Sequence, residues 1–265
     1  MTEPTPFHAS MTIIRQRLIE NVFDKFYVFV LKQLQEDGMV KGKTIGIGAT
    51  TLEGNAVMKS LERRGDHKAW QEYLEELAKA EGIENPSKED LQRLDRGRKK
   101  KVSNKEWKSR TDSDSRIGKM KDGRTHMLYK AEHSVDLETE AIVNGHVTYG
   151  DRGDTATGPE SVTLTQVNLN ELEGDLEVKE VVMDKGYHST ELLAGCATWG
   201  LRIYFPESKR KRRKWRDKAL EIEGNHRANR RRTKGNRGRK LNRKRSEYCE
   251  RTFGHVCETG GSRRT

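Results

Sequence analysis

A carboxylate at the end of a short apolar run is the first residue of this chain whose type and position could do chemistry. The run is Val181, Val182 and Met183, and Asp184 follows it directly, two residues before Gly186. Such a run is typical of a buried strand, and the glycine permits a sharp turn after it. Because ligands bind beyond the carboxyl ends of strands in open α/β sheets, Asp184 could hold a metal ion there. It could equally cap the following turn, so the pattern leaves both roles open.

Two further carboxylates lie in a basic stretch near the end of the chain. Glu247 and Glu250 are surrounded by arginine and lysine between positions 243 and 251. Intermittent apolar residues predict that this stretch is a helix that starts after Gly238. On a solvated helix such glutamates form surface ion pairs worth at most about 1 kcal/mol. A glutamate that returned to the mouth of the sheet, beside Asp184, would have a different role.

The cysteines and the lack of long apolar runs indicate the cellular compartment. Cys196, Cys249 and Cys257 form no CxxC pair, which predicts a reducing, cytoplasmic environment. Cys249 and Cys257 could be combined with His226 and His255 as zinc ligands, but their spacing matches no common pattern, so no zinc site is predicted. There is no apolar run of about 18 residues and no apolar stretch at the start, so we expect no membrane partner and no export.

The positive charge is concentrated in one segment. The formal net charge is +11, and residues 207–251 hold 20 Lys/Arg against 6 Asp/Glu, whereas the rest of the chain holds 32 against 35. Such a block binds nucleic-acid phosphates, because neutralising them releases condensed counterions. A solvated basic linker is the alternative. The side chains expected to contact nucleic acid are Lys209, Arg210, Lys211, Arg212, Arg213, Lys214, Arg230, Arg231 and Arg232.

These residues must be positioned by a mixed α/β fold with a sheet of about five strands. Residues 1–42 form an amino-terminal helical segment, and residues 43–265 form the main unit. Residues 53–124 are a charged helical insertion that supplies little core. The strands are expected at 43–52, 126–137, 141–149, 181–183 and 201–205, with helices at 160–172 and 190–199.

One of these strands carries further polar residues. His126 and Lys130 share one face of it and could point at a cleft, while His133 points to the other face. A solvated hairpin face is the simpler interpretation. Asp136 and Asp154 lie near turns and are expected to be turn residues first, with a place near a metal as the second interpretation.

Three motifs along the chain occur in an order shared with a known family. They are KTIGIGATTLEGNA at 43–56, VVMDKGYHS at 181–189 and ERTFGHVCETGGSRR at 250–264. They resemble the signature blocks of bacterial insertion-sequence transposases that have a DDE, ribonuclease H-like core. Further similar segments lie between them, and the resemblance covers nearly the whole chain from about Phe7. They are at 101–108, 119–126, 129–138 and 153–156.

The resemblance implies a fold, a reaction and partners. The fold would be a ribonuclease H-like mixed five-stranded sheet with flanking helices, an insertion after the first strand and a basic segment at about 207–240 before the last helix. Three carboxylates would hold two Mg²⁺ (or Mn²⁺) ions about 3.5 to 4 Å apart, for cleavage and transfer of DNA strands. By position Asp184 would be the second carboxylate and Glu250 the third, with Glu247 in reserve. Transposon ends and target DNA would be the partners of a nucleoid-associated homo-oligomer.

The sequence departs from this family at the first carboxylate. Gly48 stands directly before the Ala-Thr-Thr-Leu-Glu stretch, where the family has an aspartate. Glycine offers no ligand atom, so metal binding should be weakened and the rate reduced by orders of magnitude. Glu53 would lie on the opposite face of the strand and is a poor substitute. Both ends of the chain also look shorter than in the family.

The sequence therefore predicts a transposase of the DNA-transposition class whose catalysis is impaired. A non-catalytic DNA-binding remnant is the alternative, and a chain that no longer folds stably is a third interpretation. Metal-dependent strand cleavage separates the first two, since both bind phosphates. A cooperative thermal transition would exclude the third.

Overall fold

A mixed sheet forms the centre of the fold, and its middle strand is β1 (Thr44–Glu53). β5 (Thr125–Asp136) pairs antiparallel with one edge of β1, and β7 (Glu180–Val182) pairs parallel with the other. β8 (Arg202–Tyr204) extends the sheet beyond β7, also in parallel. The computed structural model describes residues 13–14, 16–98, 103–120, 122–208, 215–216 and 218–259.

Two strands share the outer edge of β5. β6 (Ile142–Tyr149) pairs antiparallel along most of it, and β4 (Arg116–Lys119) pairs with its first residues. The predicted hairpin is therefore present, but the sheet has six strands instead of five. The sequence pattern misses β4 because this strand contains a single large apolar side chain, Ile117.

Alternation of side chains gives β1 two different faces. Ile45 and Ile47 are fully buried on the first face, in the largest apolar core of the described chain. Helices α2 (Glu20–Glu36), α5 (Asp154–Asn170) and α6 (Thr190–Thr198) contribute leucines, valines and a cysteine to the same core.

Helix α5 begins at Asp154, six residues before the predicted start. The predicted helix covers 160–172, so the sequence pattern misses the first turns of α5. Pro159 lies inside the helix, beyond its first turn, so the helix lacks the hydrogen bond that a backbone N–H at this position would donate. The early start carries Asp154 and Thr157 into the helix, next to the sheet.

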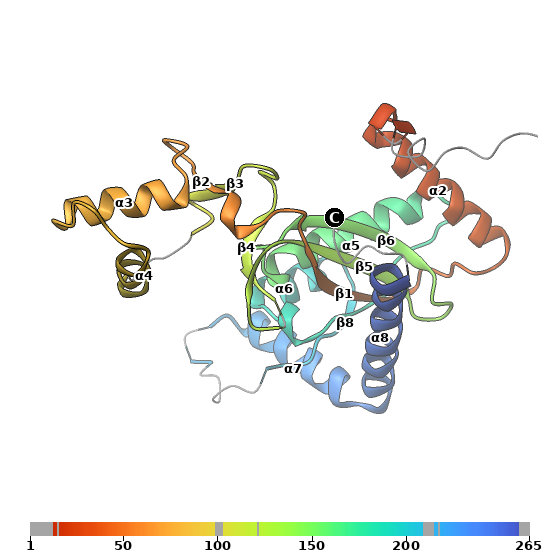
Figure 1. Cartoon of the computed structure of the whole chain (residues 1–265). Helices are drawn as coiled ribbons and strands as arrows, with labels where there is room; N and C mark the ends of the chain where they lie inside the picture. Colours follow the sequence, from red (N-terminus) through yellow and green to blue (C-terminus); the bar gives the residue numbers. More distant parts are fainter. Residues whose placement is uncertain are drawn as a thin grey trace, which may run out of the picture.

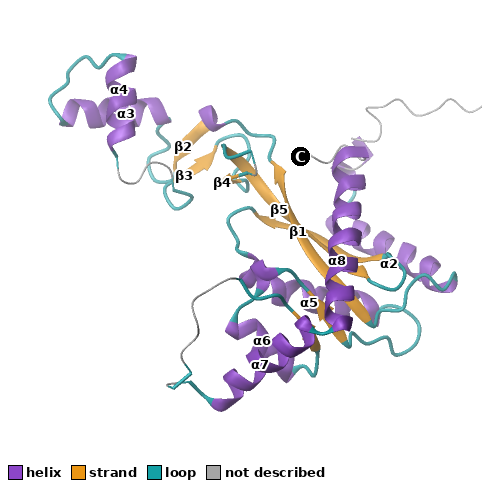
Figure 2. Ribbon diagram, turned by 90° about the horizontal axis from the view of Figure 1, so that it is seen from below, coloured by secondary structure: helices purple, strands orange, loops and turns teal. Residues whose placement is uncertain are grey.

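Helix α8 (Asn236–Gly254) lies on the opposite face of β1 from α5 (Figure 2). It follows α7 (Leu220–Lys234), which packs against α6 and β8. The sequence predicts only one helix here, after a basic segment, whereas the second half of that segment is helix α7. Acidic residues in the first turn of α7 and basic residues in its last turn favour the helix, because they complement its dipole.

The insertion between β1 and β4 extends away from the sheet (Figure 1). It contains β2 (Leu61–Arg63), β3 (Trp107–Ser109), α3 (Trp70–Ala80) and α4 (Lys88–Gly97). One small cluster joins the buried Leu61 and Trp107 to Met127 of β5, and a second is formed by Leu74, Ala78 and Leu91 within the insertion. The insertion thus packs on one end of β5 and contributes none of the residues of the largest core.

Short helical turns complete the chain. They are the 3₁₀ turns η1 (Met58–Ser60) and η2 (Lys185–Tyr187) and a π-helical turn, η3 (His255–Thr259), which continues from α8. Within the described ranges, every helix is too short or too polar to span a bilayer.

Candidate active site

Asp184 lies at the carboxyl end of β7, where it caps the turn η2. Its Oδ1 accepts a hydrogen bond of 2.6 Å from the backbone N–H of Gly186. The side chain is half-buried, and no described residue donates a hydrogen bond to Oδ2. The cap is therefore formed, and one carboxylate oxygen still faces outward from the strand end. The two roles suggested by the sequence are compatible.

Helix α8 packs directly on β1 because two glycines remove the side chains between them. A Cβ at Gly48 would lie 3.0 Å from Cβ of Cys249 and 3.6 Å from the Phe253 ring. A Cβ at Gly46 would lie 3.0 Å from Cγ of Arg245. Positions 245, 249 and 253 recur every four residues, so one face of α8 lies along β1. The thiol of Cys249 donates to the carbonyl of Gly46 at 3.7 Å.

Glu250 is the neighbour of this buried cysteine and points to solvent. Its Oε1 accepts a hydrogen bond of 2.9 Å from Ser246 Oγ. Burial raises the pKa of the Cys249 thiol to about 12, and the charges of Glu250 and Asp184 act in the same direction. Both carboxylates therefore lie within electrostatic reach of the thiol that packs on Gly48. The reserve candidate, Glu247, is instead paired with Arg251 at 2.7 Å.

The opposite face of the sheet holds a buried charged network. Lys130, 4% exposed, contacts Glu132 at 2.8 Å and Asp154 at 2.7 Å. Burial alone would raise the pKa of Glu132, but hydrogen bonds from Lys130, Ser161 and Thr157 keep it below its usual value. Burial raises the pKa of Tyr187, whose hydroxyl donates to Glu132 at 2.9 Å, and the carboxylates of Glu132, Asp154 and Asp184 reinforce the shift.

This network corrects two expectations from the sequence. The hairpin face that carries Lys130 is not solvated, because Glu132 and Asp154 neutralise the ammonium group inside the protein. Asp154 is more than a turn residue: its carboxylate lies so close to Gly186 that an added Cβ there would collide with it. It is the residue near the β7 turn that sequence reasoning undervalued, although it lies in the 153–156 segment that resembles the family.

The remaining polar residues of β5 have structural roles. Asp136 accepts a hydrogen bond of 2.8 Å from the backbone N–H of Glu138, as expected of a turn residue. Its other oxygen accepts from the backbone N–H groups of the distant Lys41 and Gly42 at 2.7 and 2.8 Å. His126 lies between carboxylates of Asp122 and Glu53. His133 lies opposite Gly48 in the sheet and stacks on Phe253, with ring centroids 4.1 Å apart. Burial lowers the pKa of His133 to about 4, so it is neutral at physiological pH.

The donor set around Gly48 does not fit a pair of metal ions. Gly48 offers no ligand atom, and Cys249 and Phe253 pack against that position. A thiol whose pKa is about 12 remains protonated and is a poor metal ligand. Glu53 contacts His126 at the far end of β1. Asp184 and Glu250 are thus the two carboxylates that remain at this place.

The predicted nucleic-acid contacts are only partly within the described residues. Positions 209–214 lie outside them, whereas Arg230, Arg231 and Arg232 lie on α7. Arg230 is paired with Glu207 at 2.8 Å, and Arg232 donates to the carbonyl of Ile203 in β8 at 3.1 Å. Arg231 is exposed. The structure therefore engages two of these three guanidinium groups in contacts within the chain.

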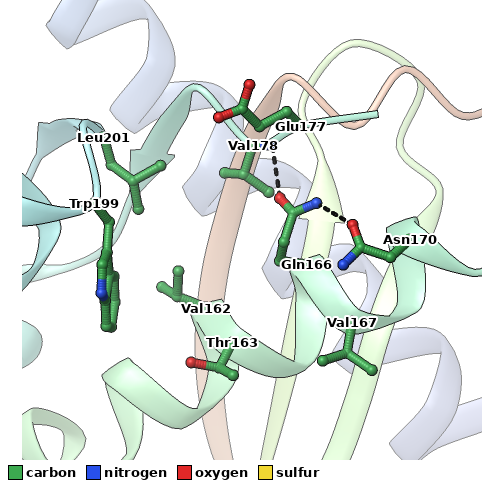
Figure 3. A pocket seen from close by; sticks show the side chains of 9 residues that line it. All are labelled: Val162, Thr163, Gln166, Val167, Asn170, Glu177, Val178, Trp199 and Leu201. Atoms are coloured by element: carbon green, nitrogen blue, oxygen red, sulfur yellow. Dashed lines mark hydrogen bonds between the residues drawn. The ribbon is translucent and has the colours of Figure 1, made fainter. Parts of the chain in front are cut away.

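The apolar hollow of Figure 3 is separate from the candidate active site. It has a volume of about 300 Å³ and is lined by Trp199, Leu201 and residues of α5. Leu201 and Val178 precede β8 and β7, so the hollow lies at the amino ends of these strands. Asp184 lies at the carboxyl end. Gln166 lines the hollow, where it donates a hydrogen bond to Asn170 and accepts one from the backbone N–H of Val178.

The sequence was compared with protein-family models, with curated proteins and with solved structures. A family model described as the transposase DDE domain matches residues 94–264, which is more than half of the chain. The match includes Asp184, Glu250 and the basic helices, while Gly48 lies before it. Neither the curated proteins nor the solved structures give a significant match. The mixed six-stranded sheet with flanking helices is consistent with the ribonuclease H-like fold of such enzymes. This chain belongs to the family of transposases with a DDE domain.

Proposed function

We propose that this protein binds DNA as a transposase-family member whose metal-dependent strand cleavage and transfer are strongly impaired. The observation that carries the proposal is the contact between Gly48 and Cys249, which places an uncharged thiol beside a position with no ligand atom. Asp184 and Glu250 are the remaining catalytic and metal-binding candidates. The family uses divalent ions and acts on DNA, and Mg²⁺ or Mn²⁺ would bind these two oxygen donors weakly.

Residues 43–265 would form the catalytic unit of such a protein, and residues 1–42 a helical segment before it. The chain would work in the cytoplasm on the ends of an insertion sequence and on target DNA, as a homo-oligomer. The DNA contacts would come from the exposed side of α7 and α8. Arg231, Lys234, Arg239, Lys240 and Arg243 are exposed there. Their charge and the basic segment at 209–214 support a phosphate-binding surface.

A nicking assay tests the impaired chemistry. The full chain is incubated with supercoiled plasmid in Mn²⁺, and the nicked fraction is compared with that produced by Asp184→Asn. We expect equal, background levels from both proteins, together with salt-sensitive DNA binding by both. Nicking by the wild-type chain that requires the metal and disappears in Asp184→Asn would contradict the impairment. Loss of DNA binding at low salt would contradict the proposal as a whole.

A further inference from the structure

Three potential ligands converge at the carboxyl end of the sheet, away from Gly48. His188 follows the turn η2, Glu207 follows β8, and His226 lies on α7. One donor atom from each side chain lies within 4.8 Å of the other two. The three elements are separate in sequence, so only the fold brings the donors together.

The site is largely closed to solvent. The side chain of His188 is 5% exposed and that of Glu207 is 27% exposed, while His226 is 1% exposed. Glu207 Oε1 is buried and accepts no hydrogen bond from any described residue, although it lies 3.7 Å from Nε2 of His188. A buried carboxylate oxygen without a hydrogen bond is costly, which indicates that the site has a further component.

Neighbouring groups hold the three side chains in place. The other oxygen of Glu207, Oε2, accepts hydrogen bonds from Arg230 at 2.8 and 3.0 Å, which fixes the carboxylate and favours its charged form. Nε2 of His226 lies 3.2 Å from Oγ1 of Thr190. Such a bond orients an imidazole whose other nitrogen binds a metal. The Trp215 ring lies 5.3 Å from that of His226.

We propose that His188, Glu207 and His226 bind a zinc ion. Two imidazoles and a carboxylate are a common zinc donor set, with metal–ligand distances of about 2.0 to 2.2 Å. Nε2 of His188 and Oε1 of Glu207 are 3.7 Å apart, which is too distant for a hydrogen bond, but at these metal–ligand distances one ion can contact both atoms. The third donor needs only a small side-chain movement. A fourth position remains for water.

This zinc ion would tie α7 to the ends of β7 and β8. Helix α7 leads directly into α8, which carries Glu250 and the exposed basic residues. An ion that binds only the folded chain stabilises it, so the zinc would hold the basic helices against the sheet. The inference is independent of the DNA chemistry, because imidazole ligands suit zinc and other transition metals, whereas carboxylates such as Asp184 and Glu250 suit Mg²⁺.

Cobalt and zinc titrations of the full chain test this site. After the protein is stripped with a chelator, one equivalent of Co²⁺ should give visible absorption bands that zinc abolishes. His226→Ala and His188→Ala should each weaken zinc binding more than about 100-fold, because loss of an outer hydrogen-bond partner alone costs 10- to 100-fold. Glu207→Gln, which has the same shape, provides a third variant should either alanine variant fail to fold.

Two controls make the result specific. His67→Asn removes an exposed histidine of the insertion, and Asp184→Asn removes a carboxylate of the candidate active site. Both should bind zinc as the wild type does. Co²⁺ should also quench Trp215 fluorescence, measured as the difference from Trp215→Phe. Absence of the cobalt bands, binding that persists in both His226→Ala and Glu207→Gln, or binding lost in Asp184→Asn would overturn the proposal.

Discussion

Gly48 and Cys249 pack against each other between β1 and α8. The glycine lets α8 approach β1, and the thiol packs on it with a pKa of about 12. Asp184 and Glu250 are both close enough to act on that thiol. A third carboxylate at position 48 would therefore meet a tight contact and two like charges, which Arg245 offsets in part and a bound cation would offset further.

Restoring the carboxylate should make stability depend on metal. We expect Gly48→Asp to lower the free energy of unfolding by about 1 to 3 kcal/mol in chelator, because the contact with Cys249 is tight and the new charge is partly buried. Millimolar Mg²⁺ should recover much of this loss. The melting temperature with and without Mg²⁺ measures the effect, and Gly48→Asn is the control of equal size. An equal response of both variants to Mg²⁺ would contradict the expectation.

His133 should make the protein sensitive to mild acid. Burial lowers its folded-state pKa to about 4, against about 6.5 when unfolded, so the unfolded chain binds the proton more readily between these values. Stability should fall as the pH drops from 6.5 to 4, by up to about 3 kcal/mol, and this contribution should level off below pH 4. Urea denaturation across this range, compared with His133→Gln, measures it. An unchanged pH slope in the variant would show that other groups are responsible.

At the scale of elements, the two faces of the sheet have different kinds of contact. On one face α8 meets β1 through glycines and a cysteine. On the other, α5 meets β5 through the buried Lys130 and Glu132 and the half-buried Asp154, which are paired. Breaking a buried pair leaves an uncompensated charge, so this network fixes how α5 and the turn η2 sit on the sheet. Asp184 is positioned by that turn.

The exposed side of α8 should carry part of the DNA affinity. Lys240 and Arg243 are exposed, so replacing both by Gln should lower the slope of log affinity against log salt by about 2 for duplex DNA. Fluorescence anisotropy at several salt concentrations gives the slope. Lys88→Gln with Arg93→Gln, on α4 of the insertion, removes the same charge elsewhere and should leave the slope near the wild-type value. Equal losses in the two double variants would mean that binding follows net charge alone.

At the scale of the whole molecule, the sheet gathers functional groups that lie far apart in the sequence. β1 and α8 are about two hundred residues apart, yet the thiol of Cys249 donates to Gly46. The carboxyl ends of β7 and β8 bring together Asp184 and, through α7, the proposed zinc ligands. The insertion extends to the side of the sheet (Figure 1).

The sequence by itself determined the features that depend on local pattern. The apolar run before Asp184 and the hairpin follow from residue types a few positions apart, and both are present. The absence of a ligand atom at Gly48 needs no structure at all. The number of strands and the start of α5 were less secure, because pairing with β5 and packing on the sheet override weak local signals.

Only the tertiary structure decided what surrounds these residues. The strand pattern predicts that Lys130 is solvated, but in the structure it is buried and paired with Glu132. Arg232 lies among basic residues that suggest DNA binding, but it contacts β8. No spacing in the sequence predicts that Cys249 packs on Gly48. The same holds for the group formed by His188, Glu207 and His226. The physical reason is that pairing of charges and close packing act between atoms in contact, whereas periodicity records only which side of one helix or strand a residue occupies.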